Sequence, residues 1–455
     1  MQQRLAKQTI ALLGVGHTNA HVLKMWRMQP IPDTQLICVS NHPIATYSGM
    51  MPGVLAGDYK SEQMEIDLVR LCSANGARLI LDEVTGVDAE RQLLQFAERP
   101  ALPYDALSIG IGSVPARGKV DIAEGAEPLA IKPMQTFLKR LHKRLKSLTK
   151  SVTDRPLKIA VVGGGAGGVE IAFCLPPRIR HDFPDTPFEI HLIHGSKQIL
   201  PGHRDSTAKR ATDQLRAADT RLHLGHRVVK IEAGTVVLDD AARGDRLEVD
   251  LVLWSTSATA PPLLETLSLR RDNRDFLLTN KKLQSVSNPR IFAVGDSGTI
   301  EGVERPKSGV FAVRQGPILW QNLARVLRGR PLLNFTPQRD FLKLINTGNG
   351  RAISEYRGRT REGRWMWRWK DRIDRKFMAM YQQYDPPMMQ ASAAPSPEDA
   401  EDAMRCLGCG GKVGGGVLRR ALAKLDVPQR DEVKIGLDDP DVQPFCSLLR
   451  AGRSW

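Results

Sequence analysis

The fold of this chain is decided by residues 157–171, LKIAVVGGGAGGVEI. The apolar run Ile159–Val162 is typical of a buried parallel strand, and the residues after the glycines suit a helix. Between them stand Gly163, Gly165 and Gly168 in the spacing GxGxxG. The first glycine would permit a tight turn, the second the close approach of a pyrophosphate, and the third close packing of helix on strand. The sequence therefore predicts a nucleotide at the N-terminus of this helix.

A second loop of this kind lies near the start of the chain. The apolar strand Thr9–Leu13 leads into Gly14, Gly16, His17 and Asn19, in the spacing GxGxxN. An asparagine in the third position can still begin a helix, so we expect these four residues to contact a cofactor. Two such loops in one chain suggest two nucleotides bound face to face.

Length and composition limit the classes of protein to consider. A chain of 455 residues can hold two or three domains, and its net charge of +15 favours anionic partners. Because the basic residues are spread along the chain, we expect no nucleic-acid partner. Six cysteines do not make a disulfide framework. With neither a signal peptide nor a long apolar stretch expected, we predict a cytoplasmic protein, free or peripheral at the inner membrane face.

The residues after the second strand of each unit do not reveal the preferred nucleotide. Gln35–Val39 is followed by Ser40-Asn41, and Phe188–Ile193 by residues 194–197, HGSK. Neither position offers the acidic residue that binds ribose hydroxyls, nor an arginine cluster that selects NADP. The choice between NADH and NADPH therefore stays open.

Two further segments carry candidate cofactor contacts. The strand within residues 105–115 ends in Gly110, Gly112 and Ser113, whose small side chains permit close backbone approach. Residues 288–297, NPRIFAVGDS, end a short strand in Gly295 and Asp296, where a carboxylate can accept hydrogen bonds from a polyol chain.

Two charged residues are candidates for catalysis. A helix is expected to begin near Ser308, and Lys307 before it would place positive potential near a developing anion. Glu170 either contacts the nicotinamide region or is simply well placed in the first turn of a helix. His17 and His21 are four residues apart, but no carboxylate or cysteine completes a site nearby, so we expect no metal.

Three segments are open to more than one interpretation. Residues 45–53, ATYSGMMPG, predict a loop that either lies against a flavin or is a surface turn. Residues 134–150 predict a basic amphipathic helix; a connector with an apolar stripe is favoured over membrane or partner docking. Trp365, Trp367 and Trp369 alternate as on one face of a strand, with a helix after them. They would form a membrane contact, a packed cap or a homodimer face.

Together these motifs resemble the FAD-dependent pyridine nucleotide oxidoreductases with two dinucleotide-binding domains. Within that class the chain is similar to type II NADH dehydrogenases and sulfide:quinone oxidoreductases. It looks closer still to the NADH-dehydrogenase-like half of proteins fused to selenide, water dikinase. The resemblance spans roughly residues 9 to 380 and rests on GVGHTNAHVL, ATYSGMMPG, GGGAGGVE, IFAVGDSG, PKSGVFAVRQGP, INTGNGRAI and KDRIDRKFM.

The resemblance implies FAD on the first glycine loop, on Gly112-Ser113 and on Asp296, with NAD(P)H on the second loop. Hydride would pass from nicotinamide C4 to flavin N5. Cys38, Cys72 and Cys174 are isolated along the sequence, so the dithiol and persulfide routes are disfavoured. A quinone or an unidentified small molecule is left as the electron acceptor.

The end of the chain resembles the opening of selenide, water dikinase. There Cys409 matches a cysteine or selenocysteine, Lys412 an essential lysine, and Asp438-Asp439 metal-binding aspartates. The match then stops, so we expect no dikinase activity.

The sequence thus predicts an α/β protein with two Rossmann-like domains, one inserted in the other, and a small C-terminal α+β region. The predicted function is FAD-dependent NAD(P)H dehydrogenation with a quinone-like or unidentified acceptor, linked through the fusion resemblance to selenium metabolism; the alternative is a non-catalytic flavin-binding scaffold for a dikinase. The predicted segments are an FAD-binding domain (1–125 and 266–330), a connector helix (126–155), an NAD(P)H-binding domain (156–265), a cap (331–385), a linker (386–402) and a truncated dikinase-like segment (403–455).

Overall fold

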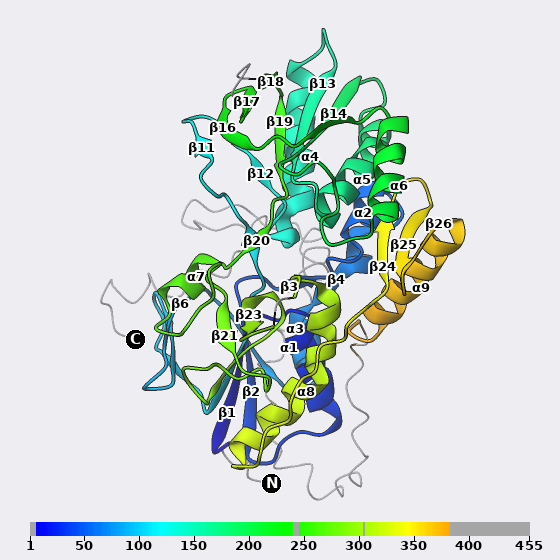
Figure 1. Ribbon diagram of the computed structural model, residues 1–455. Helices are drawn as coiled ribbons and strands as arrows, with labels where there is room; N and C mark the ends of the chain where they lie inside the picture. The colour runs from blue at the N-terminus through cyan, green and yellow to red at the C-terminus, as the bar shows by residue number, and fades with distance from the viewer. Residues whose placement is uncertain (1–5, 240–244, 304, 383, 385–455) are drawn as a thin grey trace, which may run out of the picture. The chain divides into compact units, whose positions relative to one another are not determined.

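A computed structural model describes residues 6–239, 245–303, 305–382 and 384. The first glycine loop follows a strand of a five-stranded sheet. The five strands are all parallel, in the order β22-β9-β1-β2-β5. Figure 1 labels two of them, β1 and β2. Their central residues are buried, as expected of a parallel sheet covered on both faces. The strands are β1 (Gln8–Leu13), β2 (Thr34–Ser40), β5 (Arg78–Leu81), β9 (Ala106–Ile109) and β22 (Ile291–Ala293).

The second sheet contains the second glycine loop. It is also parallel throughout, in the order β12-β19-β13-β14-β15. Since β22 joins the first sheet only after the second is complete, the second unit is inserted in the first, which confirms the predicted fold class. The strands are β12 (Leu129–Ala130), β13 (Leu157–Val162), β14 (Phe188–His194), β15 (Arg221–Leu224) and β19 (Leu251–Trp254).

Helices follow the glycine loops and cover the sheets. The predicted helix after Lys307 is confirmed as α8, which packs along α1. The predicted apolar stripe of α4 is also confirmed, because Phe137, Leu141 and Leu145 are buried. The helices are α1 (His17–Met28), α2 (Met51–Ala56), α3 (Leu68–Ala74), α4 (Met134–Ser151), α5 (Ala166–Asp182), α6 (Asp205–Ala217), α7 (Pro262–Thr266) and α8 (Gly309–Leu327), with 3-10 turns η1 (Ser61–Met64) and η2 (Gly295–Ser297).

Smaller sheets join these layers. Besides the hairpin sheet after α8, two of them have three or more strands, β6-β7-β8 and β11-β16-β17-β18, and three are strand pairs, β3-β4, β10-β20 and β21-β23. The strands are β3 (Ile44–Thr46), β4 (Glu65–Asp67), β6 (Val84–Asp88), β7 (Leu93–Phe96), β8 (Leu102–Pro103), β10 (Val114–Pro115), β11 (Asp121–Ile122), β16 (Val228–Glu232), β17 (Thr235–Leu238), β18 (Arg246–Glu248), β20 (Ala258–Thr259), β21 (Leu277–Thr279) and β23 (Gly298–Ile300).

The region after α8 forms a hairpin sheet and a long helix. The sheet contains β24 (Lys343–Asn346), β25 (Ala352–Tyr356) and β26 (Arg359–Gly363), and α9 (Arg364–Ala379) follows it directly (Figure 1). The strand predicted for the alternating tryptophans is therefore wrong. Trp365 and Trp369 are one helical turn apart, so this spacing fits a helix as well as a strand. None of the helices in the described part of the chain has the length and apolar character that a bilayer crossing requires.

Two other local predictions also need correction. Residues 45–53 are not a continuous loop, because β3 ends at Thr46 and α2 begins at Met51, with Pro52 in its first turn. Cys38 and Cys72 are not isolated in space. The neighbouring Cys72 thiol and burial raise the pKa of Cys38. Both side chains are buried, Cys38 on β2 and Cys72 on α3.

Candidate functional site

The first glycine loop leaves room for a phosphate group. Gly14 has a φ of +77°, and a Cβ there would lie 2.7 Å from the Gly110 carbonyl oxygen, so only glycine fits. Gly16 is the N-cap of α1, which has neither a side-chain cap nor an acidic residue in its first turn. The first N–H groups of α1 are therefore free for an anion, which fits the pyrophosphate of FAD.

Asn19 holds this loop in place. Its Nδ2 donates a hydrogen bond to Gly14 O at 2.7 Å, and its Oδ1 accepts one from Ser108 Oγ at 2.7 Å. The side chain is fully buried, so both of its polar atoms serve the contact between the loop and β9. A direct contact of Asn19 with a cofactor stays a prediction.

The second glycine loop has the geometry predicted for it. Gly163 has a φ of +120°, and a Cβ at this position would overlap the Ser255 carbonyl oxygen. A Cβ at Gly168 would overlap the Gly163 carbonyl oxygen, which confirms the predicted close packing of helix on strand. Gly165, the uncapped N-terminus of α5, faces open space. This arrangement fits the pyrophosphate of a second dinucleotide.

Asp296 lies in a polar cluster with Ser113 and Lys132. Ser113 Oγ donates to Asp296 Oδ2 at 2.7 Å, and Lys132 Nζ lies 2.5 Å from Ser113 Oγ and 3.6 Å from Asp296 Oδ2. Burial lowers the pKa of Lys132, whereas the Asp296 carboxylate raises it. Gly112 N donates to Ser297 Oγ at 2.9 Å and Gly295 N to the Gln315 side chain at 2.7 Å. No sequence motif surrounds Lys132, so its place beside Asp296 could not be predicted from the sequence.

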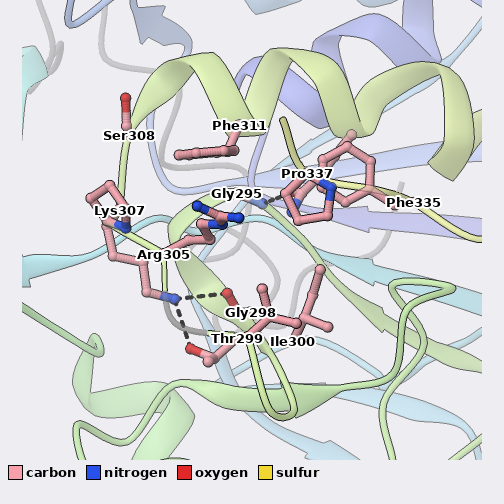
Figure 2. A pocket seen from close by; sticks show the side chains of 13 residues that line it. Gly295, Gly298, Thr299, Ile300, Arg305, Lys307, Ser308, Phe311, Phe335 and Pro337 are labelled. Atoms are coloured by element: carbon pink, nitrogen blue, oxygen red, sulfur yellow. Dashed lines mark hydrogen bonds between the residues drawn. The ribbon is translucent and has the colours of Figure 1, made fainter. Parts of the chain in front are cut away.

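Lys307 does not contact Asp296. Its Nζ donates to Gly298 O at 2.7 Å and to Thr299 Oγ1 at 2.9 Å (Figure 2). The ammonium also lies 3.8 Å from the ring centre of Phe276. Burial lowers the pKa of Lys307 to about 8. Lys307 lines a cavity of about 40 Å³, and its predicted catalytic role stays a prediction.

An aromatic group links the first glycine loop to α9. The ring of His17 lies 5.3 Å from that of Tyr47 and 5.5 Å from that of Phe377. Burial lowers the pKa of His17 to about 4, against the opposing charge of Asp296. His17 Nε2 is enclosed and has no hydrogen-bond partner among the described residues. An unpartnered polar atom beside the glycine loop fits a site built for a polar cofactor.

Next to this aromatic group lies a buried ion pair, Lys370 and Asp374. Lys370 Nζ donates to Asp374 Oδ2 and to Gly49 O, both at 2.6 Å. Tyr47 Oη donates to Asp374 Oδ1 at 3.0 Å. Burial and the neighbouring Asp374 raise the pKa of Tyr47, so its phenol keeps its proton. The segment predicted to lie against a flavin therefore contributes Tyr47 and Gly49 to this group.

Glu170 joins the second glycine loop to the same group. Its Oε1 accepts a hydrogen bond from Asn346 N at 2.8 Å, and Asn346 Nδ2 donates to Asp58 at 3.1 Å. Burial raises the pKa of Glu170 to about 7, although the Lys370 ammonium opposes the shift. Among the described residues Glu170 shares no hydrogen bond or ion pair with Tyr47, Lys370 or Asp374, but the charges of Lys370 and Asp374 act on its carboxyl group. We call these four residues, which lie on α5, before α2 and on α9, the acid cluster. The sequence singled out only Glu170.

The remaining site predictions fall outside this arrangement. Cys409 and Lys412 lie outside the described residues, as does the predicted linker. Cys174 is buried on α5, where burial raises the pKa of its thiol.

Comparison with known proteins agrees with this geometry. The model of the family described as pyridine nucleotide-disulphide oxidoreductase matches residues 22–316, more than half of the chain. The demethylphylloquinone reductase NdbB of Synechocystis is 29% identical over 358 residues, which cover 75% of this chain and 86% of that protein. A type II NADH:quinone oxidoreductase of Haemophilus influenzae is 24% identical over 54% of this chain and 61% of its own length.

An alternative NAD(P)H-ubiquinone oxidoreductase of Arabidopsis thaliana is 30% identical over 51% of this chain. The match spans 48% of that relative, so the chain covers less than two thirds of both this protein and the Haemophilus one. None of these relatives is a selenide, water dikinase, and the selenium link gains no support from them.

Solved structures show the same fold. The sulfide:quinone oxidoreductase of Aquifex aeolicus superposes with a TM-score of 0.70 at 16% identity, covering 83% of this chain and 92% of that one. The structure of NDH2 of Plasmodium falciparum in complex with NADH superposes with a TM-score of 0.68 at 15% identity, covering 84% of this chain and 99% of that one. The chain therefore belongs to the pyridine nucleotide-disulphide oxidoreductase family, as an oxidoreductase whose cofactors are FAD and NAD(P)H.

Proposed function

We propose that this protein oxidises NAD(P)H and reduces a quinone-like acceptor. FAD, when bound, supplies the centre that takes hydride from the nicotinamide and gives electrons to the acceptor. The names of the Synechocystis, Haemophilus and Arabidopsis relatives each describe a quinone reductase, which supports this choice of acceptor.

We assign the two nucleotides to the two glycine loops. FAD would lie with its pyrophosphate at the N-terminus of α1 and its ribityl chain near Asp296. Ser113 and Lys132 would hold that carboxylate in position. NAD(P)H would lie with its pyrophosphate at the N-terminus of α5, where Gly165 faces open space.

The observation that carries the proposal is the acid cluster between the two loops. Reduction of a quinone to a quinol consumes protons as well as electrons. A site from which water is excluded therefore needs residues that donate protons. With a pKa of about 7, Glu170 is close to half protonated at neutral pH and can both donate and accept a proton at its carboxylate. Tyr47 keeps its phenolic proton, which it donates in a hydrogen bond to Asp374, so Glu170 is the residue that we assign to proton transfer.

Helix α9 is the surface on which we expect the acceptor to approach. Trp365 is 75% exposed and Trp369 is 45% exposed, and Ile373 extends the same apolar surface. Arg368 lies over the ring of Trp365. Tryptophan among basic residues is typical of contact with a membrane interface, where quinones are dissolved. A homodimer through this face is the alternative.

The test is the visible spectrum of the purified protein under anaerobic conditions. We expect a flavin spectrum that bleaches within seconds of adding NADH or NADPH and returns when a short-chain quinone is added. A flavin that dithionite bleaches but neither nucleotide does would contradict the proposal and support a non-catalytic flavin scaffold. A third result is a flavin that NADH or NADPH bleaches but that quinones do not reoxidise. It would support NAD(P)H dehydrogenase activity and contradict a quinone as the acceptor.

A further inference from the structure

The carboxyl end of β14 lacks an acceptor for ribose hydroxyl groups. His194 occupies the last position of this strand, where NAD-selective units carry an acidic residue. Its Nδ1 accepts a hydrogen bond from Gly164 N at 3.2 Å. Burial lowers the pKa of His194, so the ring is neutral and its one proton is on Nε2. Neither ring nitrogen is then an available acceptor for the 2′- and 3′-hydroxyls of NADH.

Backbone hydrogen bonds bring a second segment against this strand end. Gly225 N donates to His194 O at 2.9 Å and to Ser196 O at 3.0 Å, and His226 N donates to His194 O at 3.2 Å. These bonds fix the turn between β15 and β16 beside residues 194–197. Arg227 follows that turn directly, so the fold places it next to a loop some 30 residues earlier in the chain.

Two glycines make room for two basic side chains. A Cβ at Gly195 would lie 2.7 Å from Arg227 Cγ, so the arginine crosses the space that any other side chain would fill. A Cβ at Gly225 would lie 3.8 Å from Lys197 Cγ, so the lysine stem packs beside the turn. Arg227 and Lys197 therefore flank the same short loop, which also carries Ser196.

This group has an excess of positive charge. Ser196, Lys197 and Arg227 are all exposed. In the described part of the chain Lys197 and Arg227 form no ion pair, whereas the nearby Arg221 pairs with Glu189 and Lys230 with Asp121. Asp239 Oδ1 accepts a hydrogen bond from Arg227 N at 2.7 Å. That bond engages the backbone of Arg227, and its guanidinium forms no hydrogen bond with any described residue.

We infer that Ser196, Lys197 and Arg227 bind the 2′-phosphate of NADPH and make the protein selective for NADPH over NADH. A phosphate monoester offers only acceptor oxygens and nearly two negative charges, which match a guanidinium, an ammonium and a hydroxyl donor. NADH would instead place a 2′-hydroxyl group beside two cations, and residues 194–197 offer no carboxylate to accept its hydrogen bond. The inference rests on the proposed nicotinamide nucleotide site at the Gly163 loop.

The test measures binding without turnover, using 2′,5′-ADP and 5′-AMP as probes. Isothermal titration of the FAD-loaded protein should show at least about tenfold tighter binding of 2′,5′-ADP. Arg227→Ala should weaken 2′,5′-ADP about ten- to hundredfold, as expected for loss of a charge-assisted hydrogen bond, and leave 5′-AMP unchanged. Lys197→Ala should act in the same direction. Arg216→Ala removes an exposed arginine of α6 and should change neither ligand.

Two results would overturn the inference. One is 2′,5′-ADP binding no tighter than 5′-AMP in the unaltered protein; the other is equal weakening of both probes by Arg227→Ala. A second measurement compares the rates at which NADPH and NADH bleach the flavin, and their ratio should fall about tenfold or more in Arg227→Ala. Tight 2′,5′-ADP binding by a protein that reduces no quinone would reject the proposed acceptor and leave the 2′-phosphate site standing.

Discussion

Replacing Glu170 with glutamine should change how the stability of the protein depends on pH. Glutamine has nearly the same shape, and its Oε1 can still accept the hydrogen bond from Asn346 N. What the variant loses is the ability to ionise. Any difference between the two proteins that grows with pH therefore reports on the charge of Glu170 inside the acid cluster.

The sign and size of this difference follow from the raised pKa. The pKa of Glu170 rises from 4.5 to about 7 on folding, because burial disfavours the carboxylate. Below pH 4.5 the Glu170 carboxyl group is protonated in both the folded and the unfolded chain, so its charge does not lower the free energy of unfolding. Between 4.5 and 7 the unfolded chain releases its proton first, so the stability of the unaltered protein falls. The free energy of unfolding falls by roughly 3 kcal/mol in total, and above pH 7 the contribution of Glu170 stays constant.

The assay is urea unfolding with saturating FAD, followed by tryptophan fluorescence between pH 4.5 and 8. We expect the free energy of unfolding of Glu170→Gln, relative to the unaltered protein, to rise by roughly 3 kcal/mol between pH 4.5 and 7. Glu124→Gln, at an exposed position, should show no such trend. A constant difference between Glu170→Gln and the unaltered protein over this range would refute the reasoning.

Three further substitutions test other parts of the site. Gly168→Ala places a Cβ against the Gly163 carbonyl oxygen, so NAD(P)H should no longer bleach a flavin that dithionite still reduces; normal bleaching would contradict the packing argument. Asn19→Ala leaves two buried partners unpaired and should cost about 1–3 kcal/mol in urea unfolding, with a lower flavin-to-protein ratio after purification. Asp374→Ala leaves the buried Lys370 ammonium without its carboxylate and should lower the free energy of unfolding in urea by about 3–5 kcal/mol. A decrease below about 1 kcal/mol would show that water reaches Lys370.

Local sequence signals were enough to predict the framework. A parallel strand, a glycine turn and a helix lie next to each other in the chain, so Gly163, Gly165 and Gly168 could be interpreted without knowing what surrounds them. The same holds for the loop at Gly14. The spacing of the tryptophans alone led to a wrong prediction of a strand at Trp365 and Trp369, because residues four apart share a face both in a helix and in a strand.

The sequence by itself determined the two dinucleotide-binding units and their glycine loops, since these depend on neighbours within about one helical turn or one strand. Only the tertiary structure showed Lys132 beside Asp296, Glu170 in one cluster with Lys370, and Arg227 across Gly195. These partners are brought together by strand order and helix packing across long stretches of chain. Their ionisation depends on burial, which is a property of the whole fold, so no local pattern could reveal it.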